Sequence, residues 1–86
     1  MKLIYSEYFK KKLKKRITKN NLLKKKVGKQ LKLLVLDFKH PSLKTHKLKG
    51  KRANEYAIWI EGDLRITLIL EDNTILLTDF IKHDDY

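Results

Sequence analysis

Apolar residues recur every four positions near the start of the chain, which is the spacing of a helix with one buried stripe. Between residues 7 and 18 this stripe consists of Phe9, Leu13 and Ile17. Ser6 is suited to cap the amino end of such a helix, and Glu7 places a negative charge in its first turn. The pattern therefore predicts an amphipathic helix over residues 7–18.

A second, longer apolar line predicts another helix, from Asn21 to Asp37. Its buried positions are Leu23, Val27, Leu31, Leu34 and Phe38, with Leu22 and Val35 widening the line. Asn20 and Asn21 interrupt the two patterns and can cap the second helix. Gly28 inside it costs about 1 kcal/mol relative to Ala, and a close crossing of the two helices is one reason for a glycine there. Because the connection is short, the helices should pack antiparallel as a hairpin.

The other apolar positions alternate with a period of two, as in strands. The segments of this kind are residues 2–5, 55–60, 64–70 and 74–81, with turns at 61–63 and 71–73. Such turns join hairpins, so the last three segments should form an antiparallel meander. Residues 39–51 have no periodicity and are expected to form a basic loop. We therefore predict one α+β domain over residues 1–86, in the order β-α-α-β-β-β. Its antiparallel sheet packs against an N-terminal helical hairpin, with residues 2–5 as an outer strand.

Charge is distributed unevenly along this pattern. The first 52 residues hold nineteen Lys and Arg and two acids, a net charge of +17, whereas residues 53–86 carry −6. A chain of 86 residues cannot bury so many cations, so they face solvent or a polyanion. Charge of this density attracts phosphates and accelerates encounter with them. The composition therefore indicates a nucleic-acid partner.

Other features of the composition exclude several kinds of site and several cellular locations. The chain has no cysteine, which excludes disulfides and thiolate metal sites. No apolar run approaches the roughly 18 residues of a membrane span, and the stretch Met1–Tyr5 is too short for a signal peptide. We expect a protein of the cytoplasm with no membrane partner.

Three short motifs and the order of elements carry a resemblance to a known family. The motifs are His46-Lys47-Leu48-Lys49-Gly50, Gly62-Asp63-Leu64-Arg65-Ile66 and Lys82-His83-Asp84-Asp85-Tyr86. With the order β-α-α-β-β-β on a short basic chain, they resemble the RelE/ParE superfamily of bacterial toxins. Within it, the chain is most similar to the YafQ-type messenger-RNA endoribonucleases. The resemblance implies a toxin that enters the ribosomal A site, cuts mRNA without metal and is silenced by an acidic antitoxin protein.

The resemblance also implies roles for individual residues. His46, Asp63 and His83 match catalytic positions of the branch, and Arg65 matches an arginine that grips phosphate in the wider superfamily. Tyr86 lies one residue nearer to His83 than the family aromatic does. Trp59 stands in the strand where the branch has a further histidine.

Metal-free RNA cleavage needs a base for the 2′-hydroxyl, an acid for the leaving 5′-oxygen and cations for the phosphorane. Histidine suits the first two roles, since its unperturbed pKa is about 6.5. We expect His46 and His83 to share them, Arg65 to stabilise the transition state and Asp63 to orient a histidine or the nucleotide. The residues expected to contact RNA are Lys47, Lys49, Lys51 and Tyr86. No cofactor is expected, and the spacing of Asp79, Asp84 and Asp85 matches no metal-ligand pattern.

Several alternatives stay open at this level. His40, which precedes Pro41, is expected to be a surface turn residue. Trp59 and Tyr56 could stack on a base, although strand aromatics more often belong to the core. The chain could also be a ParE-like toxin that inhibits gyrase, or a non-catalytic toxin remnant that binds RNA through charge alone.

Overall fold

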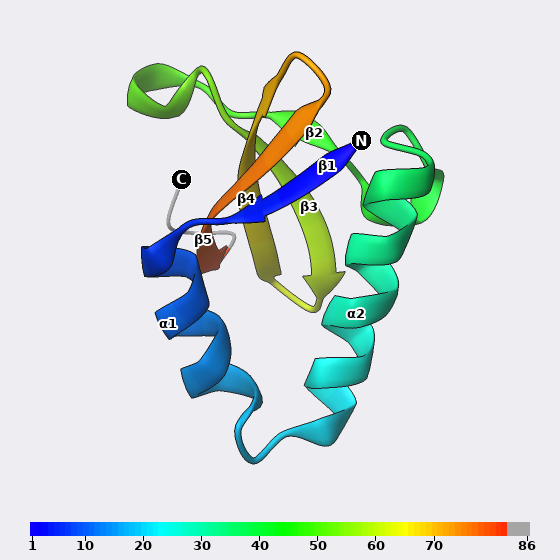
Figure 1. Ribbon diagram of the computed structural model, residues 1–86, viewed down its shortest axis with the longest axis vertical. Coiled ribbons are helices and arrows are strands. Elements are labelled where there is room, and N and C mark those ends of the chain that lie inside the picture. Colours follow the sequence, from blue (N-terminus) through cyan, green and yellow to red (C-terminus); the bar gives the residue numbers. More distant parts are fainter. Residues whose placement is uncertain (83–86) are drawn as a thin grey trace.

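The fold is a single sheet with two helices packed against one of its faces (Figure 1). The computed structural model describes residues 1–82. The helices are α1 (Glu7–Ile17) and α2 (Asn21–Leu36). The strands are β1 (Lys2–Tyr5), β2 (His46–Lys47), β3 (Tyr56–Glu61), β4 (Leu64–Glu71) and β5 (Thr74–Lys82). Two 3₁₀ turns, η1 (Pro41–Leu43) and η2 (Gly50–Arg52), flank β2. The predicted α+β class is confirmed, and the predicted elements occur in their predicted order with one additional strand, β2.

The sheet is mixed, in the order β1-β5-β4-β3-β2. β3, β4 and β5 form the antiparallel meander that the turns predicted. β1 is an outer strand as expected, but it runs parallel to β5, with Lys2 opposite Thr74. A parallel pairing is possible because both helices and the strands β2 to β4 lie between these two strands in the chain. A connection that long can cross over the sheet, whereas a tight hairpin cannot.

Both helices begin at the predicted side-chain caps. Ser6 Oγ accepts a hydrogen bond from the Phe9 N–H at 3.1 Å, and Asn20 Oδ1 accepts one from the Leu23 N–H at 3.0 Å. Each cap satisfies one of the amide groups that a helix leaves unpaired at its start. The two helices meet at their short connection and diverge from it, α1 along β5 and α2 toward β3 (Figure 1).

One apolar core joins the helices to the sheet. The α1 residue Phe9 stacks on Phe80 of β5, with ring centroids 4.9 Å apart. The predicted line of α2 is buried at Leu23, Val27, Leu31 and Leu34. Leu22, expected to widen that line, is instead 72% exposed. It points away from the sheet because the buried stripe of α2 is only one residue wide at this end.

The expected reason for Gly28 is also wrong. A β-carbon built at this position has no atom within 4 Å, so no close helix crossing requires glycine. The two helices diverge from their short connection (Figure 1). Gly28 is therefore an ordinary helical position with a residue of low helix propensity.

The basic loop holds one strand that the sequence pattern did not reveal. β2 has two residues, too few for an alternation to be visible, and it pairs with β3 through His46 opposite Ala57 and Lys47 opposite Tyr56. Beyond the pairing of His46 with Ala57, Gln30 of α2 covers the edge of β3. Its Nε2 donates to the Trp59 carbonyl at 2.8 Å and to the Ser42 carbonyl at 3.1 Å. Among residues 1–82, no helix is both long and apolar enough to cross a membrane.

Candidate functional site

The face of the sheet opposite the core, here called the outer face, carries two of the predicted site residues. Ile58 and Ile66 point into the core, so their strand neighbours point outward. Trp59 lies directly opposite Arg65 on this face, and Ala57 lies opposite Thr67. His46 pairs with Ala57 and therefore points to the same side.

Strand geometry gives the separation of His46 from Arg65. The two residues are two strands and two positions apart. With strands about 4.8 Å apart and a rise of about 3.3 Å per residue, their Cα atoms lie about 12 Å from each other. Contact of both side chains with one phosphate requires the Arg65 guanidinium to turn toward His46, because it is held at the Gly62 carbonyl at 3.0 Å. The structure thus brings an imidazole and a guanidinium to one open surface.

Arg65 and Trp59 are fixed by the turn that joins their strands. Arg65 Nη1 donates to the Gly62 carbonyl at 3.0 Å and to the Leu64 carbonyl at 3.3 Å. Trp59 Nε1 donates to the same Gly62 carbonyl at 2.9 Å. The ammonium of Lys44 lies 4.7 Å from the centre of the Trp59 ring, a cation–π contact. The outer face therefore presents a held guanidinium beside a flat aromatic ring.

The two histidines of the loop have opposite hydrogen-bonding patterns. His46 Nδ1 lies 3.3 Å from the Lys44 carbonyl oxygen, which can only accept, so Nδ1 carries the proton in this contact. The lone pair of the neutral ring is then on Nε2, the atom that a general base would use. His40 Nδ1 accepts from the Ser42 N–H at 3.2 Å, which places the proton of its neutral ring on Nε2. His40 is half-buried in the turn at Pro41, as expected for a turn residue.

A polar network holds the basic loop against the outer face. Arg52 donates to both carboxylate oxygens of Glu55, at 2.7 and 3.2 Å, and to Thr67 Oγ1 at 3.1 Å. Thr78 Oγ1 lies 2.7 Å from Thr67 Oγ1 and donates to Glu55 at 2.6 Å. The hydrogen bonds from Arg52 hold the pKa of Glu55 below its ordinary value of 4.5, although burial opposes them. Because Arg52 ends η2, this network fixes the segment that carries Lys47, Lys49 and Lys51.

The network extends to α1 across the edge of β5. β1 pairs with β5 only as far as Leu77, and beyond it side chains contact the edge, beginning with Ser6 Oγ, which donates to the Thr78 carbonyl at 3.5 Å. Lys12 Nζ lies 2.7 Å from Asp79 Oδ1 and donates to the Phe80 carbonyl at 3.4 Å. Hydrogen bonding to Asp79 raises the pKa of Lys12. The ion pair therefore ties the first helix to the same sheet face as the basic loop.

Asp63 lies apart from His46. It belongs to the β3–β4 turn and lines a hollow of about 550 Å³ together with Arg16, Lys26 and Lys82. His46 is paired at the level of Ala57, and the turn lies at least four residues farther along β3, or about 13 Å. The two side chains cannot span this distance. The expected role of Asp63 in orienting a histidine therefore does not apply to His46.

The remaining predicted residues have mixed positions. Lys47 is exposed and points to the helix side of the sheet, with its ammonium 6.0 Å from the centre of the Tyr56 ring. Lys49 and Lys51 are exposed on and beside η2. His83 and Tyr86 lie outside the described residues.

The residues that support this surface belong to none of the sequence motifs. They are Arg52, Glu55, Thr67, Thr78 and the buried Gln30. The spacing of Arg52 and Glu55, three residues apart with opposite charge, was a signal for a local pair. The two threonines occupy strand positions whose facing residues could not be known before the register.

Neither models of protein families nor curated protein sequences give a match to this chain. Solved structures do match. The YoeB/ParE toxin from Agrobacterium tumefaciens has a TM-score of 0.83 at 14% identity, covering 96% of this chain and 99% of its own. The YoeB–YefM complex from Staphylococcus aureus has a TM-score of 0.81 at 21% identity, covering 96% and 97%.

YafQ from E. coli strain BL21(DE3) is also similar, with a TM-score of 0.74 at 20% identity over 96% of this chain and 93% of that one. In each case the similarity spans nearly the whole of both chains, so no element of the fold is left over. At these identities the similarity concerns the fold. The chain therefore has the fold of the RelE/ParE superfamily of toxins, to which YoeB and YafQ belong, as its sequence motifs indicated.

Proposed function

We propose that this chain is the toxin of a type II toxin–antitoxin pair and cleaves messenger RNA on the ribosome without a metal ion. One observation carries the proposal. His46 and Arg65, on different strands and far apart in the sequence, point to one open face of the sheet. The full-length similarity to YoeB and YafQ structures supports the same reading.

The chemistry follows from the groups on that face. His46 Nε2 accepts the proton of the RNA 2′-hydroxyl, and the 2′-oxygen attacks the adjacent phosphorus. Arg65 holds the added charge of the phosphorane with two hydrogen bonds. The bond from phosphorus to the 5′-oxygen then breaks, and His83 protonates that oxygen. The products are a 2′,3′-cyclic phosphate and a free 5′-hydroxyl.

Lysines flanking this face supply the affinity for RNA in the proposal. Lys49 and Lys51 are exposed on the segment that Arg52 and Glu55 anchor. Because this ion pair fixes the segment before RNA binds, binding costs less conformational entropy than it would for a flexible segment. Asp63, which is remote from His46, is left with the role of contacting the nucleotide.

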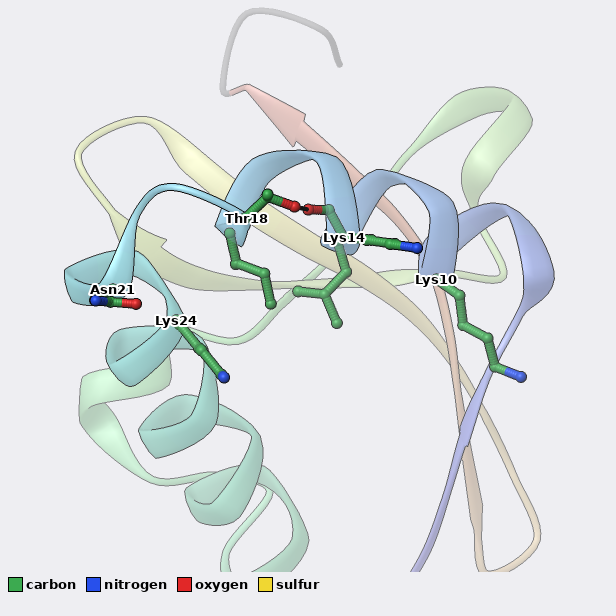
Figure 2. A pocket seen from close by; sticks show the side chains of 7 residues that line it. Lys10, Lys14, Thr18, Asn21 and Lys24 are labelled. Carbon is green, nitrogen blue, oxygen red and sulfur yellow. Dashed lines mark hydrogen bonds between the residues drawn. The ribbon is translucent and has the colours of Figure 1, made fainter.

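An acidic antitoxin is the protein partner in this proposal. YoeB from S. aureus is solved in a toxin–antitoxin complex with YefM. In this chain, α1 and α2 enclose a hollow of about 360 Å³ near their connection (Figure 2). Its floor is apolar, with Leu13 and Ile17, and its rim carries Lys10, Lys14 and Lys24. Such a groove matches an amphipathic segment with apolar anchors and acidic flanks.

A reconstituted translation reaction tests the proposal. A defined message is translated with purified components, and its 5′ ends are mapped by primer extension. We expect discrete in-frame cuts only when ribosomes are present. His46→Ala and His83→Ala should each lower the cleavage rate at least tenfold and leave ribosome binding intact.

Other outcomes separate the remaining functions. An intact message together with blocked DNA supercoiling would indicate a gyrase inhibitor. An intact message with normal supercoiling would leave a binder of RNA that acts through charge. For the partner, co-expression with the adjacent reading frame should give a tight complex, and Lys14→Glu with Lys24→Glu should weaken it.

A further inference from the structure

A third hollow lies at the edge of the sheet, away from the outer face. It has a volume of about 400 Å³ and lies between the end of α2, η1 and the start of β3. Its lining includes Phe38, Tyr56 and Pro41, with Lys39 and Lys44 at its border. No carboxylate of the described chain is among the residues that line it. The hollow is thus apolar inside and cationic outside.

The two aromatic rings form a corner. Phe38 and Tyr56 lie 5.3 Å apart between ring centroids, with their planes at 87°. Both are only partly buried against the core. A flat ring that lies against one of them therefore presents its edge to the other, which satisfies both preferred aromatic geometries at once.

The charged and hydrogen-bonding groups around the hollow indicate which class of ligand fits it. The Lys47 ammonium lies 6.0 Å from the centre of the Tyr56 ring, so an anion attached to a stacked ring is near a cation. His40 lines the hollow, and its contact with the Ser42 N–H leaves an Nε2–H donor on the neutral ring. A planar heteroaromatic ring with acceptors on its edge and a phosphate beside it is a nucleotide. We propose that this hollow binds one unstacked base of single-stranded RNA.

The position of β2 links this base site to the candidate cleavage face. His46 and Lys47 are consecutive on β2 and point to opposite sides of the sheet, His46 outward and Lys47 toward Tyr56. β2 is also the outermost strand of the sheet, so the two faces meet at its edge. An RNA that contacts His46 can therefore place a neighbouring base against Tyr56. The inference rests on the RNA-directed part of the proposed function and does not require cleavage.

The test measures binding of RNA that cannot be cleaved. The probe is a short single strand with 2′-O-methyl groups, and a phosphodiester strand of equal length without bases is its control. Tyr56→Leu should weaken binding of the base-bearing strand about fivefold to a hundredfold, the loss of one stacked base. Binding of the base-free strand should not change. Tyr56→Phe should retain wild-type affinity, because stacking needs the ring and not the hydroxyl.

Matched variants exclude a general loss of structure. Tyr5 is also a half-buried tyrosine, 5.8 Å from Phe9, but it lies on β1 and away from the hollow. Tyr5→Leu should leave both affinities unchanged. If Tyr56→Leu does not fold, Phe38→Leu removes the other wall and carries the same expectation.

Three results would overturn the inference. Tyr56→Leu could bind the base-bearing strand as tightly as the wild type. It could also weaken both strands equally, which would show a change of charge or fold. Free AMP could bind as tightly as the oligomer, which would make a mononucleotide the occupant. If no cleavage is detected but Tyr56→Leu still weakens binding of the base-bearing strand, only the proposed nuclease activity is rejected and the base site stands.

Discussion

Trp59 and Arg65 face each other across β3 and β4, and both donate a hydrogen bond to the carbonyl oxygen of Gly62, at 2.9 and 3.0 Å. The glycine has a φ of +50°, in the left-handed region. The turn therefore positions the carbonyl between the two side chains only while that conformation holds. One backbone group thus couples the guanidinium of the candidate site to the ring beside it.

This coupling gives the first prediction. Gly62→Ala should destabilise the fold by about 1–2 kcal/mol, because a β-carbon disfavours the left-handed conformation. Urea unfolding measures the loss. Trp59 is the only tryptophan of the chain, so its fluorescence reports directly on the hydrogen bond from Trp59 Nε1 to the Gly62 carbonyl. An unchanged emission spectrum and midpoint would show that the turn does not hold the two side chains.

Arg65 gives the second prediction, which concerns cleavage. Arg65→Lys keeps the charge but loses the planar fork that grips a phosphate with two hydrogen bonds. The cleavage rate should fall tenfold or more, and Arg65→Ala should fall further. Primer extension measures the rate, and urea unfolding checks that both variants are folded. A lysine variant as active as the wild type would reduce the role of Arg65 to charge alone.

Local patterns were sufficient for both helices, for every strand of the described chain except β2, and for most of the core. The caps at Ser6 and Asn20 and the stripes of both helices act within a few residues, so the sequence shows them. The direction of β1 could not be known in this way. It depends on a pairing between residues 2–5 and 74–77, which no local pattern encodes.

The arrangement of the candidate site also depends on strand pairings that no local pattern encodes. That His46 and Arg65 share a face follows from the register of three strands, one of which has only two residues. The separation of Asp63 from His46 follows from the same register. Gln30 is another residue that no local pattern identifies, since it lies among lysines in the sequence and yet is 4% exposed and covers the edge of β3. Its burial depends on where β2 stops.

Gly28 gives the third prediction. Its α-carbon lies inside α2 with open space around it, so an added methyl group meets nothing. Gly28→Ala should stabilise the protein by about 1 kcal/mol, the difference in helix propensity. For a domain of this size that gain raises the melting temperature by roughly 4–8 °C. A calorimetric scan measures it, and a lower melting temperature would mean that an unseen contact needs the glycine.

Glu55 gives the fourth prediction, a pH dependence of stability. Glu55 is paired with Arg52 through two hydrogen bonds and its side chain is only 12% exposed. Its pKa in the folded state is lower than the ordinary value of 4.5, chiefly because of Arg52. The pair therefore contributes stability that is present above about pH 4.5 and is lost as the pH falls through the lowered pKa.

Glu55→Gln isolates this contribution. At neutral pH the variant should be less stable by roughly 1.5–3 kcal/mol, the range for hydrogen bonds to a charged group. As the pH falls below 4.5, protonation removes the same charge from the wild type, so the two stabilities should converge. Glu71→Gln, at an exposed position on the same sheet, controls for the loss of one negative charge. Urea unfolding at several pH values gives the curves. A gap between the wild type and Glu55→Gln that stays constant down to pH 2 would assign the loss to packing instead of the ion pair, and the loop carrying Lys49 and Lys51 would need another anchor.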